Sequence, residues 1–361
     1  MNTKAWEPGG TMNTRGKIIL LGSGERSPHI RTVYHWLFEQ MADPIQVAIL
    51  ETPAGFELNS DYVAGRIGQY IEEHLQNFAP QITVVPARKR NTPYSPDDPA
   101  IVQPLFEANV LFIGPGSPTY AVRQLQNSLA WRALLAQHAM GATTIIASAA
   151  TLAVGVEALP IYEIYKVGEE LHWKPGLDLF GPYGLSLVFI PHWNNQEGGA
   201  VLDTSRCYMG LARYEPLAAM LPPGRTIVGI DEATALIVDP VAQMCRVMGL
   251  GGVTLVRDGQ EQHFASGENF AIEHLGPFEL PDPQTGLPAA VWAHAQAAQA
   301  KRVPEQRWNV SLPPEVMALV ERREAARQAQ DWALSDGLRA QIEALGWQVQ
   351  DTEVGPTVQP L

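Results

Sequence analysis

Residues 143–150 read TTIIASAA, and this stretch decides the fold class. Its first five residues are uncharged and include two isoleucines, which predicts a short strand buried on both faces. Ser148 follows this strand directly, and the small residues Ala149 and Ala150 lead into a helical segment. A strand, a sharp turn and a helix in this order are typical of a nucleophile elbow, which holds a hydroxyl above the carboxyl edge of a sheet. Ser148 is therefore a candidate nucleophile, with a helix-capping serine as the alternative interpretation.

Short apolar runs upstream of this stretch alternate with helical patterns. The runs are residues 17–22, 45–51, 82–86 and 110–114, and the helical patterns are residues 28–41, 60–78, 100–107 and 119–140. Parallel strands that are buried on both faces and joined by right-handed helical crossovers produce this alternation. The sequence therefore predicts an α/β fold with a doubly wound, mostly parallel sheet. Ligand sites in such sheets lie at the carboxyl edge.

Downstream of Ser148 the pattern is less regular. A strand at 185–191 leads into His192, residues 199–221 have helical periodicity, and an antiparallel extension of the sheet is predicted from short runs at 226–231, 235–239, 244–249 and 253–257. We expect a flexible tail at 1–16, a main domain at 17–275, a linker with one helix at 276–311 and a helical module at 312–361. In that module, two antiparallel helices broken near residues 329–331 are predicted to bury Trp332 and the leucines.

Composition limits the class of protein and its partners. Hydrophobic residues make up 46% and charged residues 17%, which is typical of globular proteins. No apolar run is long enough to cross a bilayer, and the polar N-terminus does not resemble a signal peptide, so no membrane partner is expected. The two cysteines, Cys207 and Cys245, fit a reducing, cytoplasmic compartment. The net charge of −13 disfavours a nucleic-acid partner and leaves a small substrate.

Two further segments place polar groups at the predicted carboxyl edge. His192 comes just past a strand end, where it can serve Ser148 as general base; a hydrogen-bonded structural histidine is the alternative. The turn Gly-Pro-Gly at 114–116 follows another strand, and the N–H groups of Gly116 and Ala149 can stabilise an oxyanion; a plain tight turn is the alternative. No His, Cys and Glu spacing fits a metal site, and the glycines at 22 and 24 lack the third glycine of a dinucleotide fingerprint, so neither metal nor cofactor is expected.

Taken in order, these segments resemble the peptidase S51 family of aspartyl dipeptidases and cyanophycinases, which has a class I glutamine-amidotransferase-like fold. The resemblance covers residues 17–270 and is carried by residues 114–116, 147–149, 191–193 and 229–235 together with Arg206 and Arg213. It implies that Ser148 is the nucleophile and His192 the base. It also implies a triad acid between them in sequence, for which Glu163 has the best spacing and Glu169 and Glu170 are rivals.

The matched segments suggest a substrate-binding set as well, namely Arg206, Arg213, Asn194 and Glu232. Two positions depart from the family pattern, because Ile146 and Ala150 replace the glycines of its elbow. We expect Ser148 to keep a strained backbone and Ile146 to be buried. The resulting hypothesis is a serine peptidase or amidase for a small peptide or amide. A catalytically inactive binding protein on the same fold is the first alternative, and an RNA-associated factor is the second.

Residues 312–355 carry a second resemblance, to the C-terminal end of bacterial cysteinyl-tRNA synthetases. It rests on the order and spacing of residues 320–327, 331–333, 335–336, 338–339, 346–347 and 351–352. The chain has no HIGH or KMSKS signature, so amino-acid activation is not expected. Residues 312–361 hold eight acidic and four basic side chains, which favours a hairpin that packs or forms a homodimer over one that binds tRNA.

Overall fold

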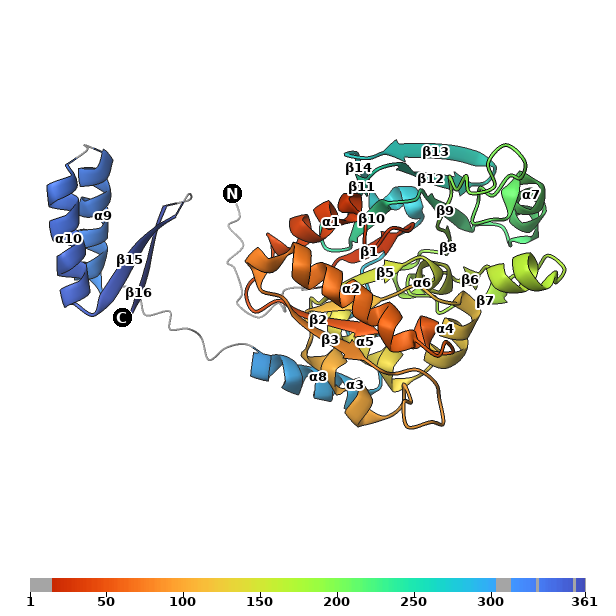
Figure 1. The fold of residues 1–361 in the computed structure, drawn as a ribbon, viewed down its shortest axis with the longest axis horizontal. Helices are drawn as coiled ribbons and strands as arrows, with labels where there is room; N and C mark the ends of the chain where they lie inside the picture. The colour runs from red at the N-terminus through yellow and green to blue at the C-terminus, as the bar shows by residue number, and fades with distance from the viewer. Residues whose placement is uncertain (1–14, 303–312, 329–330, 353–354, 361) are drawn as a thin grey trace, which may run out of the picture. The chain divides into compact units, whose positions relative to one another are not determined.

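The computed structural model describes residues 15–302, 313–328, 331–352 and 355–360. They belong to two compact units, Met1–Ala300 and Lys301–Leu361 (Figure 1). Of the tail expected at 1–16, residues 1–14 lie outside the described residues.

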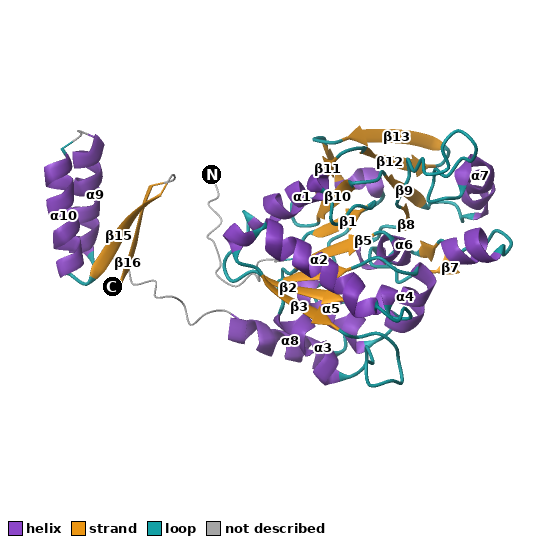
Figure 2. Cartoon of the chain, in the orientation of Figure 1, coloured by secondary structure: helices purple, strands orange, loops and turns teal. Residues whose placement is uncertain are grey.

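An eight-stranded sheet forms the centre of the main unit, in the order β14-β11-β10-β1-β5-β4-β2-β3 (Figure 2). The strands from β1 to β3 in this order are parallel to one another. On the other side, β10 pairs with β1, β11 with β10 and β14 with β11, each time in antiparallel fashion. The parallel strands are β1 (Ile18–Leu21), β5 (Thr143–Ala147), β4 (Val110–Ile113), β2 (Gln46–Leu50) and β3 (Gln81–Val85). The antiparallel strands are β10 (Thr234–Asp239), β11 (Met244–Gly249) and β14 (Asn269–Ala271). The predicted α/β class with a largely parallel sheet is confirmed.

A second sheet has the order β13-β12-β9-β8. Its strands are β8 (Leu187–Ile190), β9 (Thr226–Ile230), β12 (Gly252–Arg257) and β13 (Gln260–Ala265), and only β8 and β9 are parallel to each other. A short pair, β6 (Glu157–Ala158) and β7 (Lys174–Pro175), lies outside both sheets. The strand that leads into His192 therefore belongs to the second sheet and not to the sheet that carries Ser148.

Helices cover both faces of the large sheet because its buried strands have two apolar faces. Successive residues of β1 enter opposite cores, so that Ile18 and Leu20 pack in one and Ile19 and Leu21 in the other. The helices of the main unit are α1 (Pro28–Phe38), α2 (Ser60–His74), α3 (Pro99–Glu107), α4 (Pro118–Leu125), α5 (Leu129–Ala139), α6 (Ala149–Ala153), α7 (Gly210–Met220) and α8 (Ala289–Arg302).

Two parts of the main unit differ from expectation. Helix α8, expected inside a linker, packs Val291, Ala295 and Ala298 into the core, so that the compact unit extends to Ala300. The helix expected over 199–221 begins only at Gly210, because the backbone at residues 206–208 is left-handed and cannot join a right-handed helix.

The C-terminal unit contains the two predicted helices and a hairpin that was not predicted. These elements are α9 (Pro314–Gln328), α10 (Trp332–Ala344), β15 (Trp347–Thr352) and β16 (Gly355–Pro360). Val316, Ile342 and Val349 form its core, and Leu338 is also buried. Trp332 is 56% exposed and Leu334 47% exposed, so the expectation that they are buried was wrong. Trp332 is the first residue of its helix, which Asp331 caps, and its ring lies 5.7 Å from the Arg327 guanidinium.

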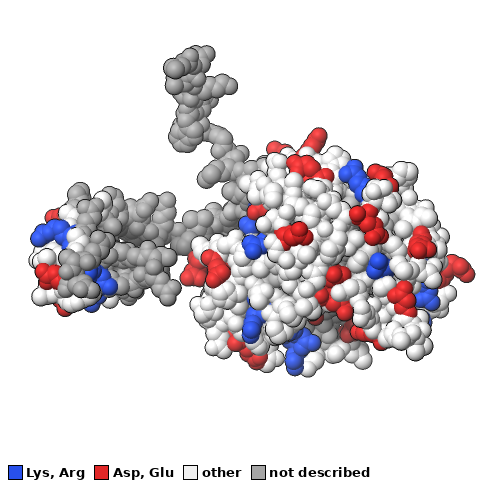
Figure 3. Space-filling model, turned by 90° about the horizontal axis from the view of Figure 1, so that it is seen from above, with Lys and Arg blue, Asp and Glu red and all other residues white. Residues whose placement is uncertain are grey.

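The surface of the main unit agrees with the acidic composition. Acidic side chains are spread over the face shown in Figure 3, with basic side chains among them. Among the residues that the structure describes, no helix is long and apolar enough to span a membrane. The same residues contain no group of three or more His, Cys, Asp or Glu side chains placed to hold a metal ion.

Candidate active site

Ser148 occupies the sharp turn between β5 and α6. Its φ of 53° and ψ of −111° lie in a region that non-glycine residues rarely adopt, at a cost of about 1–3 kcal/mol. Its N–H donates to the carbonyl of Leu21 at the end of β1, at 3.2 Å. Ile146 and Ala150, which replace the elbow glycines, are 0% and 1% exposed and pack in the core, so the turn keeps the strained geometry that we expected.

His192 reaches the same edge from the second sheet. It lies just beyond β8 with a φ of 51°, and its N–H donates to the carbonyl of Gly22 at 3.2 Å. Consecutive carbonyls at the end of β1 therefore hold both residues, because Leu21 binds Ser148 and Gly22 binds His192. A side chain at position 22 would place its Cβ 2.0 Å from the carbonyl oxygen of Asp231, so only glycine fits there. The Ser148 Oγ lies 3.1 Å from the His192 Nε2.

Glu232 completes the arrangement from the loop between β9 and β10. Its Oε1 accepts a hydrogen bond from the His192 Nδ1 at 2.8 Å and another from the Asn195 Nδ2 at 2.8 Å. The Glu232 N–H donates to the Asn194 Oδ1 at 2.9 Å, which fixes the loop against the segment after β8. The hydrogen bond from His192 is the main reason that the pKa of Glu232 lies below its ordinary value of 4.5. An ionised Glu232 accepts only, so Nδ1 carries the proton and Nε2 is free to accept one.

The expected triad acid lies elsewhere. Glu163 begins a π-helical turn, Glu163–Val167, and its Oε1 accepts a hydrogen bond from the Thr119 hydroxyl at 2.6 Å. The Glu169 Oε2 lies 3.6 Å from the His172 Nε2, and the backbone carbonyl oxygen of Glu170 lies 2.8 Å from the His172 Nδ1. The expectation that one of these three carboxylates orients His192 was wrong, because Glu232 occupies that position.

Two backbone N–H groups lie in the segments that follow the neighbouring strands β4 and β5. Gly116 follows β4, the neighbour of β5, with a φ of 149°, and a Cβ there would lie 2.0 Å from the carbonyl oxygen of Pro53. Ala149 is the first residue of α6. Within residues 15–302, neither N–H donates a hydrogen bond to another protein group. Both therefore remain candidate oxyanion donors.

A cavity of about 260 Å³ opens beside Ser148 and His192. Its lining includes Tyr162, Lys166 and Glu197, which the sequence did not single out. The Tyr208 ring lies 5.9 Å from the His192 ring and also lines it. Tyr162 and Lys166 belong to a short helical segment that ends at Val167, and Glu197 and Tyr208 lie in turns. Segments this short have no periodic pattern, so the sequence held no signal for these side chains. Cys207 lines the cavity too, but burial raises the pKa of its thiol to about 12, which keeps it protonated and a poor nucleophile.

None of the four residues expected to bind substrate lines this cavity in the described part of the main unit. Arg206 stacks its guanidinium on the Trp193 ring at 3.9 Å and donates to the Trp193 carbonyl at 3.2 Å. Arg213 is exposed on α7. Asn194 and Glu232 are held in the loop contacts described above. The strand-end serine and histidine were thus brought together as predicted, whereas the substrate-binding set was not.

The main unit resembles solved peptidase structures. A peptidase from an acI-B1 Actinobacterium superposes with a TM-score of 0.56 at 20% sequence identity, covering 72% of this chain and 98% of that one. The main unit has the fold of that peptidase. A putative peptidase E protein from Listeria monocytogenes EGD-e matches with a TM-score of 0.42 at 13% identity, over 70% of this chain and 98% of that one.

The C-terminal unit resembles part of another protein. The family model of the cysteinyl-tRNA ligase anticodon binding domain matches residues 309–356. The cysteine–tRNA ligase of Methanosarcina acetivorans is 53% identical over 47 residues, and that of Chlamydia felis is 46% identical over 50 residues. These matches cover 13% and 14% of this chain and 10% of each ligase, so the chain shares about a tenth of the ligases' length. The second resemblance predicted from the sequence is confirmed.

Proposed function

We propose that the main unit is a serine hydrolase, a peptidase or amidase of the S51 type, that acts on small peptides or amides. The observation that carries the proposal is the continuous chain of hydrogen bonds from the Ser148 Oγ through His192 to Glu232, at 3.1 Å and 2.8 Å. Nucleophile, base and orienting acid in this order are the arrangement that acyl transfer requires. The strained backbone of Ser148 and the peptidase fold support the same reading.

The reaction follows from the positions of these groups. As the Ser148 Oγ attacks the substrate carbonyl, the His192 Nε2 accepts its proton and Glu232 stabilises the imidazolium that forms. The N–H groups of Gly116 and Ala149 hold the developing oxyanion. His192 then donates its proton to the leaving amine, which leaves an acyl-serine. Water attacks this ester with His192 again as the base, and Ser148 is regenerated.

A fluorophosphonate probe tests this function directly. We expect covalent labelling of the native protein, with the added mass on the tryptic peptide that contains Ser148, because only an activated serine reacts readily. Heat-denatured protein serves as the control and should not be labelled. A native protein that resists the probe would contradict the hydrolase and favour the alternative, a catalytically inactive binding protein on the same fold.

A second candidate function is binding of a tRNA by the C-terminal unit, which the match to an anticodon binding domain favours. Its test compares the full chain with a chain that ends at Arg302, at several salt concentrations. If the unit binds tRNA, the full chain is retained on immobilised tRNA at low salt, salt releases it, and the truncated chain is not retained. Labelling of Ser148 should be equal in both chains, because the two units are separately compact. Equal retention of both chains would contradict this function.

A further inference from the structure

An ion pair with a buried carboxylate lies at the carboxyl ends of β2 and β3. Glu51 follows β2 directly and is 3% exposed, and its Oε2 accepts hydrogen bonds from the Arg88 Nε at 2.6 Å and the Ser60 Oγ at 3.0 Å. Arg88 lies just beyond β3. A buried ion pair adds little net stability, because the cost of removing its charges from water offsets their attraction. The pair instead fixes the ends of two neighbouring strands to each other.

The ion pair holds a 3₁₀ turn, Thr52–Ala54, against the segment after β3. The Glu51 N–H donates to the Val85 carbonyl at 3.1 Å, and the Thr52 hydroxyl donates to the Ala87 carbonyl at 2.5 Å. The ion pair is the third connection between the same two segments. The 3₁₀ turn therefore cannot shift relative to β3 without breaking hydrogen bonds.

The 3₁₀ turn contacts the Gly-Pro-Gly turn at 114–116 directly. The Pro53 carbonyl accepts a hydrogen bond from the Ser117 N–H at 2.8 Å. This N–H belongs to the peptide that follows Gly116, so the bond restricts the ψ angle of Gly116. A Cβ at Gly116 would lie 2.0 Å from the same Pro53 oxygen, so the two backbones are in close contact. The position of Pro53 therefore fixes the direction of the Gly116 N–H.

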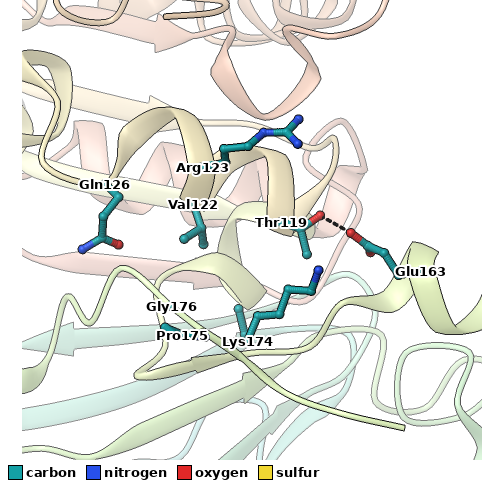
Figure 4. A pocket seen from close by; sticks show the side chains of 9 residues that line it. Thr119, Val122, Arg123, Gln126, Glu163, Lys174, Pro175 and Gly176 are labelled. Carbon is teal, nitrogen blue, oxygen red and sulfur yellow. Dashed lines mark hydrogen bonds between the residues drawn. The ribbon is translucent and has the colours of Figure 1, made fainter. Parts of the chain in front are cut away.

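Helix α4, which follows the Gly-Pro-Gly turn, is held by two further contacts. The Tyr120 hydroxyl donates to the Arg88 carbonyl at 3.0 Å. The Thr119 hydroxyl donates to the Glu163 Oε1 at 2.6 Å, the hydrogen bond drawn in Figure 4. Arg88 therefore contacts the helix into which the Gly-Pro-Gly turn leads, and through Glu51 it also holds the element on which that turn packs.

We propose that the Glu51–Arg88 ion pair positions the Gly116 N–H as an oxyanion donor. It does so by holding Pro53 in place, and the inference rests on the hydrolase function proposed above. In the part of the main unit that the structure describes, neither member of the pair lines the cavity beside Ser148, so both are positioning residues. An oxyanion donor acts mainly on the transition state, where the negative charge develops. Loss of the ion pair should therefore slow the reaction of the serine more than it weakens binding.

The test compares full-length variants by their reaction with a fluorophosphonate. The phosphoryl oxygen of this probe gains negative charge as Ser148 attacks, so the reaction needs the same donors as attack on a carbonyl. Glu51→Gln and Arg88→Met together remove the ion pair without leaving a buried charge unpaired. The maximal labelling rate should fall by about 10- to 100-fold, less than the loss of a whole donor. The probe concentration at half-maximal rate should change by less than about three-fold.

A second readout follows the Gly-Pro-Gly turn itself. Hydrogen–deuterium exchange of the peptide that contains Ser117 should be about ten-fold faster in the double variant, because the bond to Pro53 is weakened. Arg88→Lys should keep labelling within about five-fold of the wild type, since an ammonium can still pair with Glu51. Glu51→Gln alone keeps the shape of the side chain and replaces the double variant if that does not fold. It should slow labelling by about three-fold or more.

Glu157→Gln with Arg225→Met is the matched control. This ion pair has an N–O distance of 3.5 Å, and both of its side chains are partly buried. It joins β6 to the residue before β9. Its loss should change the labelling rate by less than about two-fold, because the Gly-Pro-Gly turn keeps all of its contacts.

The outcomes separate the role of the ion pair from the hydrolase itself. Labelling of the double variant, or of Glu51→Gln in its place, as fast as the wild type would overturn the positioning role. Slower labelling with unchanged exchange at Ser117 would also overturn it, because the effect would then bypass the Gly-Pro-Gly turn. In both cases the labelled wild type still supports the hydrolase. A wild type that no fluorophosphonate labels would reject the hydrolase and, with it, this proposal.

Discussion

Replacing Ser148 by alanine is expected to lower kcat/KM for any peptide or amide that the protein hydrolyses by about 10⁴- to 10⁶-fold. The variant keeps the Cβ and the backbone turn but has no oxygen to form the acyl intermediate. Residual turnover would come from the oxyanion donors and from substrate binding alone. Initial rates under pseudo-first-order conditions measure the effect, and circular dichroism checks that the fold is kept. Unchanged turnover would show that Ser148 is not the nucleophile.

Ser128→Ala is the matched control for this prediction. Ser128 caps α5, where its hydroxyl accepts from the Trp131 N–H at 3.1 Å, and it does not line the cavity beside Ser148. Its loss should cost about 1 kcal/mol of unfolding free energy, the usual value of a helix cap. The rate should remain within about two-fold of the wild type, because the groups that react are untouched. The control therefore separates loss of a hydroxyl from loss of the nucleophile.

Glu232→Gln should produce the second large effect, a fall in kcat of about 10³- to 10⁴-fold. The amide keeps the shape of the side chain but can donate to the His192 Nδ1, which favours the tautomer in which Nε2 carries the proton and cannot accept it from Ser148. The measurement is kcat for the wild type and the variant across neutral pH. Rates within about ten-fold of each other would contradict the role of Glu232.

The pH dependence of that comparison provides a further check. Because the hydrogen bond from His192 lowers the pKa of Glu232, the carboxylate stays ionised at its ordinary pKa of 4.5 and for some way below it. The ratio of wild-type to variant rates should therefore be constant across neutral pH. It should shrink only as the pH falls through the lowered pKa, where Glu232 becomes a neutral acid. Glu169→Gln, a change at an exposed glutamate that pairs with His172, should leave the rate within about two-fold of the wild type.

Much of the fold was predictable because the signals are local. The strands that end at Leu21, Leu50, Ile113 and Ala147 are short apolar runs between helical patterns, and such runs form buried parallel strands in most contexts. Amphipathic surface strands and loops carry weaker signals. Residues 206–208 have a left-handed backbone but include no glycine, the residue that usually marks such a conformation in a sequence. Their apolar pattern therefore predicted a helix.

The site was predictable only where a residue follows its own strand. Ser148 and His192 each come directly after an apolar run, and that is visible in the sequence. Glu232 also follows a strand, β9, but the family resemblance implied an acid between Ser148 and His192 in the sequence. Chain order does not report which strand ends meet in space. The role of Glu232 depends on β9 lying beside β8, and no local pattern encodes that pairing.

By itself the sequence determined the alternation of buried strands and helices, the serine and histidine at two strand ends, and the C-terminal helices, because each depends on neighbours along the chain. Tertiary structure decided the rest. It places Glu232, and not Glu163, against the His192 Nδ1. It also stacks the Arg206 guanidinium on the Trp193 ring and packs α8 into the core. It also brought Lys166 and Tyr208 together in the cavity beside Ser148. Each of these depends on contacts between segments far apart in the chain, where the free energy of packing and not local propensity selects the partner.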